Sequence, residues 1–207
     1  MNFIQNQIEV FDSIINLIEY DVFEPVDYLD QLSAIEKERF FQFKHIKRQR
    51  EFVATRILRH SIFGFKHIHY NTIGAPYIEG EGFISISHSQ NVIGIAVNQN
   101  FQVGFDLENA SDKAKRLHTK FLNQEERIIF DTEDEMEMTK CWSAKETLYK
   151  LAGRNLIDFK KELVLDKNEN EISGTIINPD EIIEVKLHDF IYKNQIITIN
   201  KLPVVRK

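Results

Sequence analysis

Residues 83–108 read FISISHSQNVIGIAVNQNFQVGFDLE and contain three strand-like runs in succession. Residues 83–87 alternate apolar and polar side chains, residues 92–97 are rich in β-branched side chains, and residues 103–108 alternate again. Such runs are typical of β-strands. The polar residues 87–91 separate the first two runs and are expected to form a loop.

Two helical regions flank these strands. Between residues 35 and 58 apolar side chains recur mostly at three- and four-residue steps, which predicts one or two amphipathic helices. Ser33 and Glu36 form a capping-box pattern at the start, and Gly64 marks the end. Residues 140–151 are expected to form another helix, which stops near Gly153.

The remaining segments read as short strands. Residues 1–30 suggest short strands and turns that are interrupted at Pro25, and the tail suggests an antiparallel sheet with a turn at residues 168–170. Its strands are expected at residues 163–165, 184–187 and 196–199. Because strands and helices follow one another without regular βαβ alternation, the order predicts an α+β fold.

Composition narrows the class of protein. The 207 residues are 43% hydrophobic and 28% charged, which is typical of a globular protein, and the net charge of −6 counts against a nucleic-acid binder. The single cysteine, Cys141, excludes an internal disulfide and fits a reducing compartment. No apolar run approaches the roughly 20 residues that span a bilayer. Residues 1–20 lack Lys and Arg, unlike a signal peptide, so a cytoplasmic protein without membrane contact is expected.

The two-residue spacing of Asp106 and Glu108 is compatible with a metal-binding pair of carboxylates. On a strand these two carboxylates point to the same face, while Phe105 and Leu107 point into apolar packing. Neighbouring carboxylates suit Mg²⁺, which keeps waters and binds substrate phosphates. The alternative is a solvent-facing strand with alternating polar residues.

Glu146 and Lys150 lie one turn apart on the expected helix and share a face. They could supply a third metal carboxylate and a phosphate-binding amine, or they could form an ordinary surface pair. Ser87 and His88 at a strand end could hold phosphate oxygens, or they could belong to an exposed polar turn.

The arginines from Arg50 to Arg59 could bind phosphate or cover a solvated helix face. No Walker A loop, no G-x-G-x-x-G and no G-x-S-x-G elbow occurs, and the histidines have no cysteine partners at zinc spacing. Nucleotide binding by those loops, serine-hydrolase chemistry and a zinc site are therefore not supported.

The order of these motifs is more specific than any one of them. An arginine-bearing helix, G-x-P, S-x-S-H-S, G-x-D-x-E, F-L-x-x-E-E and W-S-x-K-E-x-x-x-K follow one another over residues 35–165. This order resembles the Sfp-type 4′-phosphopantetheinyl transferases.

The resemblance implies a role for each matching position. It assigns Asp106, Glu108 and Glu146 to Mg²⁺, and it gives Glu146 a catalytic role as well. Glu126 matches a glutamate proposed to activate the acceptor serine, and Lys150 matches a lysine beside the pyrophosphate that assists the leaving group. The positions implied to bind the coenzyme are Arg50, Ser87, His88 and Lys150, with His88 at the 3′-phosphate.

The family fold implies two similar α+β halves that form an intramolecular pseudo-dimer. Residues 1–100 would grip the phosphates of coenzyme A, residues 101–207 would carry the metal carboxylates and the catalytic helix, and the site would lie at their interface. The implied partners are coenzyme A and an apo acyl or peptidyl carrier protein, and a monomer is expected. One departure is Ala75, which replaces a lysine that is common in the family and holds the 3′-phosphate.

Two other functions fit some of these features. A non-catalytic homologue that binds coenzyme A or a carrier protein would be favoured by loss of a metal carboxylate, and none is lost. A generic Mg²⁺ phosphohydrolase would explain the carboxylates but not Ser87, His88 and Lys150.

Overall fold

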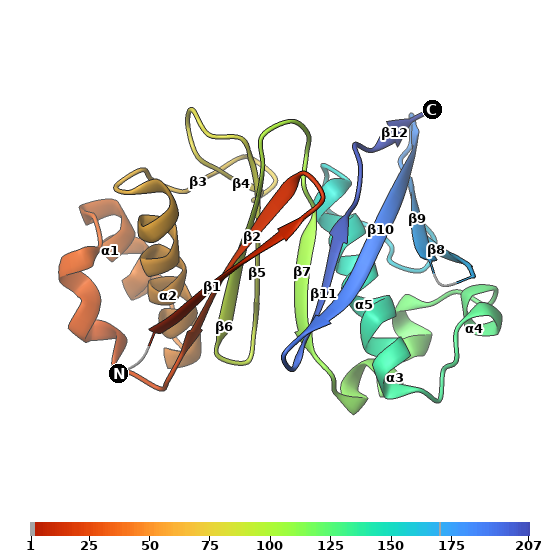
Figure 1. The fold of residues 1–207 in the computed structure, drawn as a ribbon, viewed down its shortest axis with the longest axis horizontal. Helices are drawn as coiled ribbons and strands as arrows, with labels where there is room; N and C mark the ends of the chain where they lie inside the picture. Colours follow the sequence, from red (N-terminus) through yellow and green to blue (C-terminus); the bar gives the residue numbers. More distant parts are fainter. Residues whose placement is uncertain (1–2, 170) are drawn as a thin grey trace.

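The first of two main sheets is built from the N-terminal half of the chain. The computed structural model describes residues 3–169 and 171–207. The four strands of this sheet are β1 (Phe3–Val10), β2 (Ser13–Tyr20), β5 (Phe83–Ser89) and β6 (Val92–Asn98). They pair antiparallel in the order β1-β2-β6-β5 (Figure 1).

The second sheet is built from the C-terminal half. Its strands are β7 (Phe105–Asn109), β8 (Leu163–Asn168), β9 (Glu171–Ile177), β10 (Ile182–Tyr192), β11 (Gln195–Asn200) and the short β12 (Val205–Arg206). Their antiparallel order is β7-β11-β10-β9-β8, and β12 pairs with β10. A separate two-stranded hairpin joins β3 (His69–Tyr70) and β4 (Pro76–Tyr77).

Helices cover both sheets. In the N-terminal half they are the 3₁₀-helix η1 (Pro25–Gln31), α1 (Ala34–Gln42) and α2 (Ile46–Phe63), and α2 packs on β2 and β6. In the C-terminal half they are α3 (Asp112–Phe121), α4 (Glu126–Ile129) and α5 (Glu135–Leu151), and α5 packs on the second sheet. The expected mixture of helices and antiparallel sheets is confirmed.

The local signals explain where the helices begin and end. Ser33 and Glu36 form the capping box at the start of α1, and Gly64 follows α2 with a positive φ of 62°. The periodic region is split into two helices at Phe43, whose backbone is extended. Gly153 has φ 71°, as expected beyond a helix C-terminus. The charged helix α3 was not predicted, and Asn170 of the predicted 168–170 turn lies outside the described residues.

Three apolar clusters stabilise the two halves and join them. One lies between the first sheet and α1 and α2, and another lies between the second sheet and α5. The third contains residues from β2, β6, β7 and β11 and therefore connects the two sheets. Gly94 permits this contact, because a Cβ there would lie 2.5 Å from the Phe105 ring. In the described parts of the chain, none of the helices combines the length and the apolar character that crossing a membrane requires.

Candidate active site

The candidate site lies where β5 of the first sheet meets β7 of the second, and Figure 1 shows these strands next to each other. Serine side chains of β5 bond to the backbone of β7. Ser85 Oγ accepts a hydrogen bond from Phe105 N at 3.1 Å, and Ser87 Oγ accepts one from Leu107 N at 3.3 Å. The polar alternation in β5 therefore serves the junction between the two halves.

Asp106 is the most buried carboxylate of this junction, with only 3% of its surface exposed. Its Oδ1 accepts hydrogen bonds from Ser87 Oγ at 2.8 Å and from Lys150 Nζ at 2.9 Å. Its Oδ2 is buried and has no hydrogen-bond partner among the described residues. The alternative of a solvent-facing strand is therefore wrong, and the unpaired oxygen is costly unless another group binds it.

Glu108 and Glu146 lie close enough to Asp106 for its negative charge to change their pKa values. Burial, followed by repulsion from Asp106, raises the pKa of each carboxyl group to about 7. Glu146 adds to the repulsion on Glu108, whereas the Trp142 Nε1 hydrogen bond to Glu108 Oε1, at 2.9 Å, opposes it. Three half-buried or buried carboxyl groups that repel one another are a chemically suitable donor set for a divalent cation.

The three carboxylates lie near one another, but they are not arranged so that all three could bind one metal ion. Across residues 3–169 and 171–207, no three Asp, Glu, His or Cys side chains have the geometry to hold a metal ion. Asp106 Oδ1 already accepts hydrogen bonds from Lys150 and Ser87. The unpaired Asp106 Oδ2 and the raised pKa values of the two glutamates still fit a cation, so the predicted Mg²⁺ set stays a prediction.

A pH experiment tests this cluster. Between about pH 4.5 and 7 the folded protein should hold more protons on Glu108 and Glu146 than the unfolded chain does, so these groups make stability fall as pH rises. A divalent cation binds the deprotonated carboxylates and should reverse this loss. We therefore expect Mg²⁺ to raise Tm more at pH 8 than at pH 5, as measured by thermal denaturation with EDTA as the metal-free reference.

His88 and His188 have lowered pKa values and act in the opposite direction, so the comparison needs a matched control. Glu146→Gln should show a smaller fall in Tm from pH 5 to pH 8 without metal, and a smaller Mg²⁺ effect. An equal Mg²⁺ increment at both pH values in the unmodified protein would contradict a carboxylate site.

Lys150 extends from the same face of α5 as Glu146, as the one-turn spacing predicts. Its Nζ donates to Phe105 O at 2.6 Å and to Asp106 Oδ1 at 2.9 Å. The alternative of a simple surface pair with Glu146 is therefore wrong. Lys150 connects the carboxylates to the neighbouring cavity.

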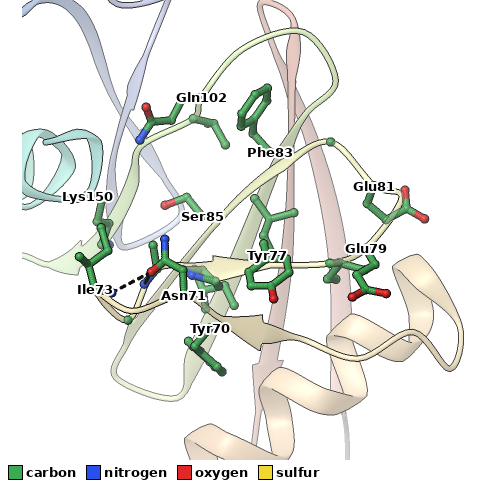
Figure 2. A pocket seen from close by; sticks show the side chains of 18 of the residues that line it. Tyr70, Asn71, Ile73, Tyr77, Glu79, Glu81, Phe83, Ser85, Gln102 and Lys150 are labelled. Carbon is green, nitrogen blue, oxygen red and sulfur yellow. Dashed lines mark hydrogen bonds between the residues drawn. The ribbon is translucent and has the colours of Figure 1, made fainter. Parts of the chain in front are cut away.

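This cavity has a volume of about 850 Å³ and is bounded by residues 70–86 and by parts of residues 99–155. Figure 2 shows Lys150 beside Asn71 and Ile73 at one end, with Glu79 and Glu81 at the other. Asn71 Oδ1 accepts hydrogen bonds from the backbone N–H groups of Ile73 and Ala75 and so shapes the turn. A cavity of this size accommodates a ligand as large as a coenzyme.

The phosphate-binding candidates of the N-terminal half are separated. Arg50 Nε donates to Phe23 O at 2.6 Å, and its Nη2 lies 3.5 Å from Glu24 Oε1, so it faces the η1 segment. His88, at the exposed end of β5, instead contacts Arg48, with 2.8 Å between Arg48 Nη1 and His88 Nε2. Arg48 was missed because the sequence does not show which face of α2 meets β5.

Glu126 contacts none of the other residues that were predicted to form the site. It is 0% exposed, and its Oε1 lies 2.6 Å from the Nζ of Lys145, which is also 0% exposed. Glu126 Oε1 also accepts from Leu165 N at 2.7 Å, and Oε2 accepts from Asn123 N at 2.7 Å. These contacts give Glu126 a structural role in this conformation, and its expected role in activating an incoming serine, which requires an accessible carboxylate, stays a prediction.

Trp142 is the first residue of the W-S-x-K-E-x-x-x-K motif, and the sequence predicted no role for it. Its ring packs between Phe121 and Phe159, with centroid distances of 5.3 and 5.6 Å, and its Nε1 holds Glu108. A second cavity of about 490 Å³ adjoins these rings and Glu108. The four-residue step from Trp142 to Glu146 on one helix face was the available signal.

A family model and a known protein are similar to this chain. Residues 102–200 match the family model described as the 4′-phosphopantetheinyl transferase superfamily. The chain is also similar to the 4′-phosphopantetheinyl transferase HetI of Nostoc sp., with 28% identity over 163 residues that cover 69% of each protein. The matched region contains the strand with Asp106 and Glu108 and the helix with Glu146 and Lys150. Together with the ordered motifs, these matches show that the C-terminal half of the chain is similar to the 4′-phosphopantetheinyl transferase superfamily.

Proposed function

We propose that this chain transfers the 4′-phosphopantetheine arm of coenzyme A to a serine of an apo carrier protein, with Mg²⁺, and releases adenosine 3′,5′-bisphosphate. The observation that carries the proposal is the unpaired buried Oδ2 of Asp106 next to Lys150, at the edge of the 850 Å³ cavity. Similarity to the superfamily supports phosphopantetheine transfer as the class of reaction.

The proposed metal ligands are Asp106, Glu108 and Glu146. When bound there, Mg²⁺ would neutralise the pyrophosphate of coenzyme A and stabilise the charge that develops during transfer. Trp142 orients Glu108 by its hydrogen bond, and Ser87 orients Asp106.

Lys150 is proposed to act on the phosphates. In the transfer, the serine oxygen forms a bond to the phosphorus that carries pantetheine, and the bond to the bridging oxygen of the bisphosphate breaks. The Lys150 ammonium lies at the cavity wall beside Asp106, from which it can donate hydrogen bonds to the leaving phosphate. Catalysis then depends mainly on positioning and electrostatic stabilisation, in which Glu146 and Lys150 take part.

The coenzyme is proposed to lie in the cavity, with its phosphates toward Ser87, His88 and Lys150. Arg50 would join this set only by leaving its contacts to Phe23 and Glu24. We further propose that residues 1–100 and residues 101–207 are two similar halves of a pseudo-dimer within a monomer. The two sheets, each covered by helices, support this division.

Detection of the released product tests the proposed function. Incubation with coenzyme A, Mg²⁺ and an apo carrier protein should produce adenosine 3′,5′-bisphosphate, measured by chromatography. A carrier whose acceptor serine is replaced by alanine should give none. Binding of coenzyme A without release of the bisphosphate to any apo carrier would instead favour the non-catalytic alternative.

A further inference from the structure

The hydroxyl of Thr198 is buried and unpaired beneath α5. Thr198 lies on β11 and is 1% exposed, and its Oγ1 has no hydrogen-bond partner in the parts of the chain that the structure describes. Its neighbours Ile197 and Ile199 point into the apolar cluster between the two sheets. Because side chains alternate along a strand, Thr198 points to the opposite face, on which α5 packs.

Asp106 is the cross-strand neighbour of Thr198. The antiparallel pairing of β7 and β11 sets the two residues directly opposite each other. Asp106 also faces α5, because Lys150 of that helix donates to its Oδ1, while Phe105 and Leu107 point into the apolar cluster. Opposite residues in an antiparallel pair have Cβ atoms about 4.5–5.5 Å apart. The unpaired Oγ1 of Thr198 and the unpaired Oδ2 of Asp106 therefore belong to neighbouring side chains on one buried face.

These two unpaired atoms are complementary. A hydroxyl has one proton to donate, whereas an ionised carboxylate can only accept. Each atom is costly to bury alone, and a hydrogen bond between them removes both costs. Rotation of the Thr198 side chain into another staggered position moves Oγ1 without moving the backbone. A hydrogen bond from Thr198 Oγ1 to Asp106 Oδ2 is the pairing that the strand register offers.

This pairing leaves room for a cation on Asp106. The two oxygens of a carboxylate offer about four lone-pair positions. Ser87 and Lys150 already use Oδ1. The Thr198 hydroxyl would occupy one position of Oδ2 and leave the other free. With both oxygens held by hydrogen bonds, the carboxylate would be fixed in one orientation toward the other two carboxylates of the site.

We propose that Thr198 is a positioning residue for Asp106, and that it acts through a hydrogen bond from its hydroxyl to Oδ2. The inference rests on the proposed function, because it names a residue that supports the same metal site. Hydrogen bonds to a ligating carboxylate fix its orientation, and loss of one typically costs about 10–100-fold in metal affinity. Thr198 contacts neither the coenzyme nor the metal in this account and acts only through Asp106.

Calorimetric titration of Mg²⁺ in saturating coenzyme A tests the proposal without any carrier protein. Thr198→Val keeps the shape of the side chain and removes the hydroxyl, so it should raise the Kd for Mg²⁺ about tenfold or more. Thr198→Ala also removes the hydroxyl and should raise this Kd as well. Thr198→Ser keeps the hydroxyl and should keep the Kd of the unmodified protein. The Kd for coenzyme A, measured in EDTA, should stay unchanged in all three variants.

Thermal denaturation in EDTA separates positioning from a merely unpaired hydroxyl. If Thr198 donates to Oδ2, Thr198→Val leaves the carboxylate without that donor and should lower Tm. If the hydroxyl had no partner in solution, the same substitution would remove a buried unsatisfied group and raise Tm. A raised Tm together with an unchanged Kd for Mg²⁺ overturns this inference and leaves the proposed function intact.

Ser143→Ala is the matched control. Ser143 Oγ is likewise buried and unpaired among the described residues, but Ser143 belongs to α5 and is not the strand neighbour of Asp106. This substitution should leave the Kd for Mg²⁺ unchanged. Equal weakening of Mg²⁺ binding by Ser143→Ala, or by Thr198→Ser, overturns the assignment to the Thr198 hydroxyl. Failure of the unmodified protein to bind Mg²⁺ overturns the proposed metal site, and the inference with it.

Discussion

Glu146→Gln is expected to reduce phosphopantetheine transfer about a thousandfold, since loss of a metal ligand removes several kcal/mol of transition-state stabilisation. The folded protein should survive and, without metal at pH 8, should gain stability. The reason is that burial and Asp106 raise the pKa of Glu146 to about 7, so its charged form is unfavourable in the folded state. Transfer rates and Tm without Mg²⁺ measure both effects.

Glu135→Gln is the matched control, because it makes the same substitution at an exposed position in the first turn of the same helix. It should leave transfer unchanged. Transfer by Glu146→Gln at the unmodified rate in saturating Mg²⁺ would remove Glu146 from the metal ligands. A strong fall in Tm together with lost transfer would mean that the substitution acts through folding.

The buried pair of Glu126 and Lys145 is expected to dominate stability in the C-terminal half. Lys145 Nζ donates to Phe159 O at 2.9 Å and also to Leu163 O, so the pair ties α5 to the start of β8 and to the segment before it. Removing one member of a buried pair costs about 3–5 kcal/mol, because the other charge stays buried without a partner. Glu126→Gln and Lys145→Met should each lower Tm by about 10 °C.

The double variant provides the control for this prediction. Glu126→Gln combined with Lys145→Met should destabilise the protein by less than the sum of the two single substitutions, because neither then leaves a buried charge. Urea denaturation gives the three free energies of unfolding. If Glu126→Gln kept its Tm but lost transfer, the structural role would be wrong and the catalytic role implied by the family resemblance would return.

The strand and helix periods made part of the site predictable. The two-residue spacing of Asp106 and Glu108 and the four-residue spacing of Glu146 and Lys150 predicted shared faces, and the structure brings these side chains to one junction. Local periodicity was sufficient there because each pair lies within one element. It did not show that Lys150 would bond to Asp106 on a different element.

The burial of Glu126 and the directions of the α2 arginines depend on contacts between distant parts of the chain, which sequence patterns do not show. The backbone N–H of Glu126 donates to Asn123 Oδ1, and α4 is a single turn that packs against β8 and buries its first residue, Glu126. The ion-pair partner of Glu126, Lys145, lies on α5, and no local sequence pattern predicts this contact. Arg48 and Arg50 point to different sides of α2, and only the position of β5 shows which one meets His88.

Helix α3 was not predicted, although its apolar residues Ala114, Leu117 and Phe121 recur at three- and four-residue steps. The rest of the helix is mostly charged or polar, and of its ten residues only Ala114 and Phe121 are buried. The apolar face is therefore narrow, and the helix packs against α5. An apolar pattern of three residues in a charged stretch gives only a weak signal.

Intact-mass measurement of an apo carrier protein after incubation with this protein, coenzyme A and Mg²⁺ tests the central claim most directly. We expect the carrier to gain the mass of one phosphopantetheine, and we expect no gain with EDTA, with Lys150→Ala, or with a carrier that lacks its acceptor serine. An unmodified mass for apo carriers of fatty-acid, polyketide and peptide synthesis, under conditions in which coenzyme A binds, would contradict the proposed transfer.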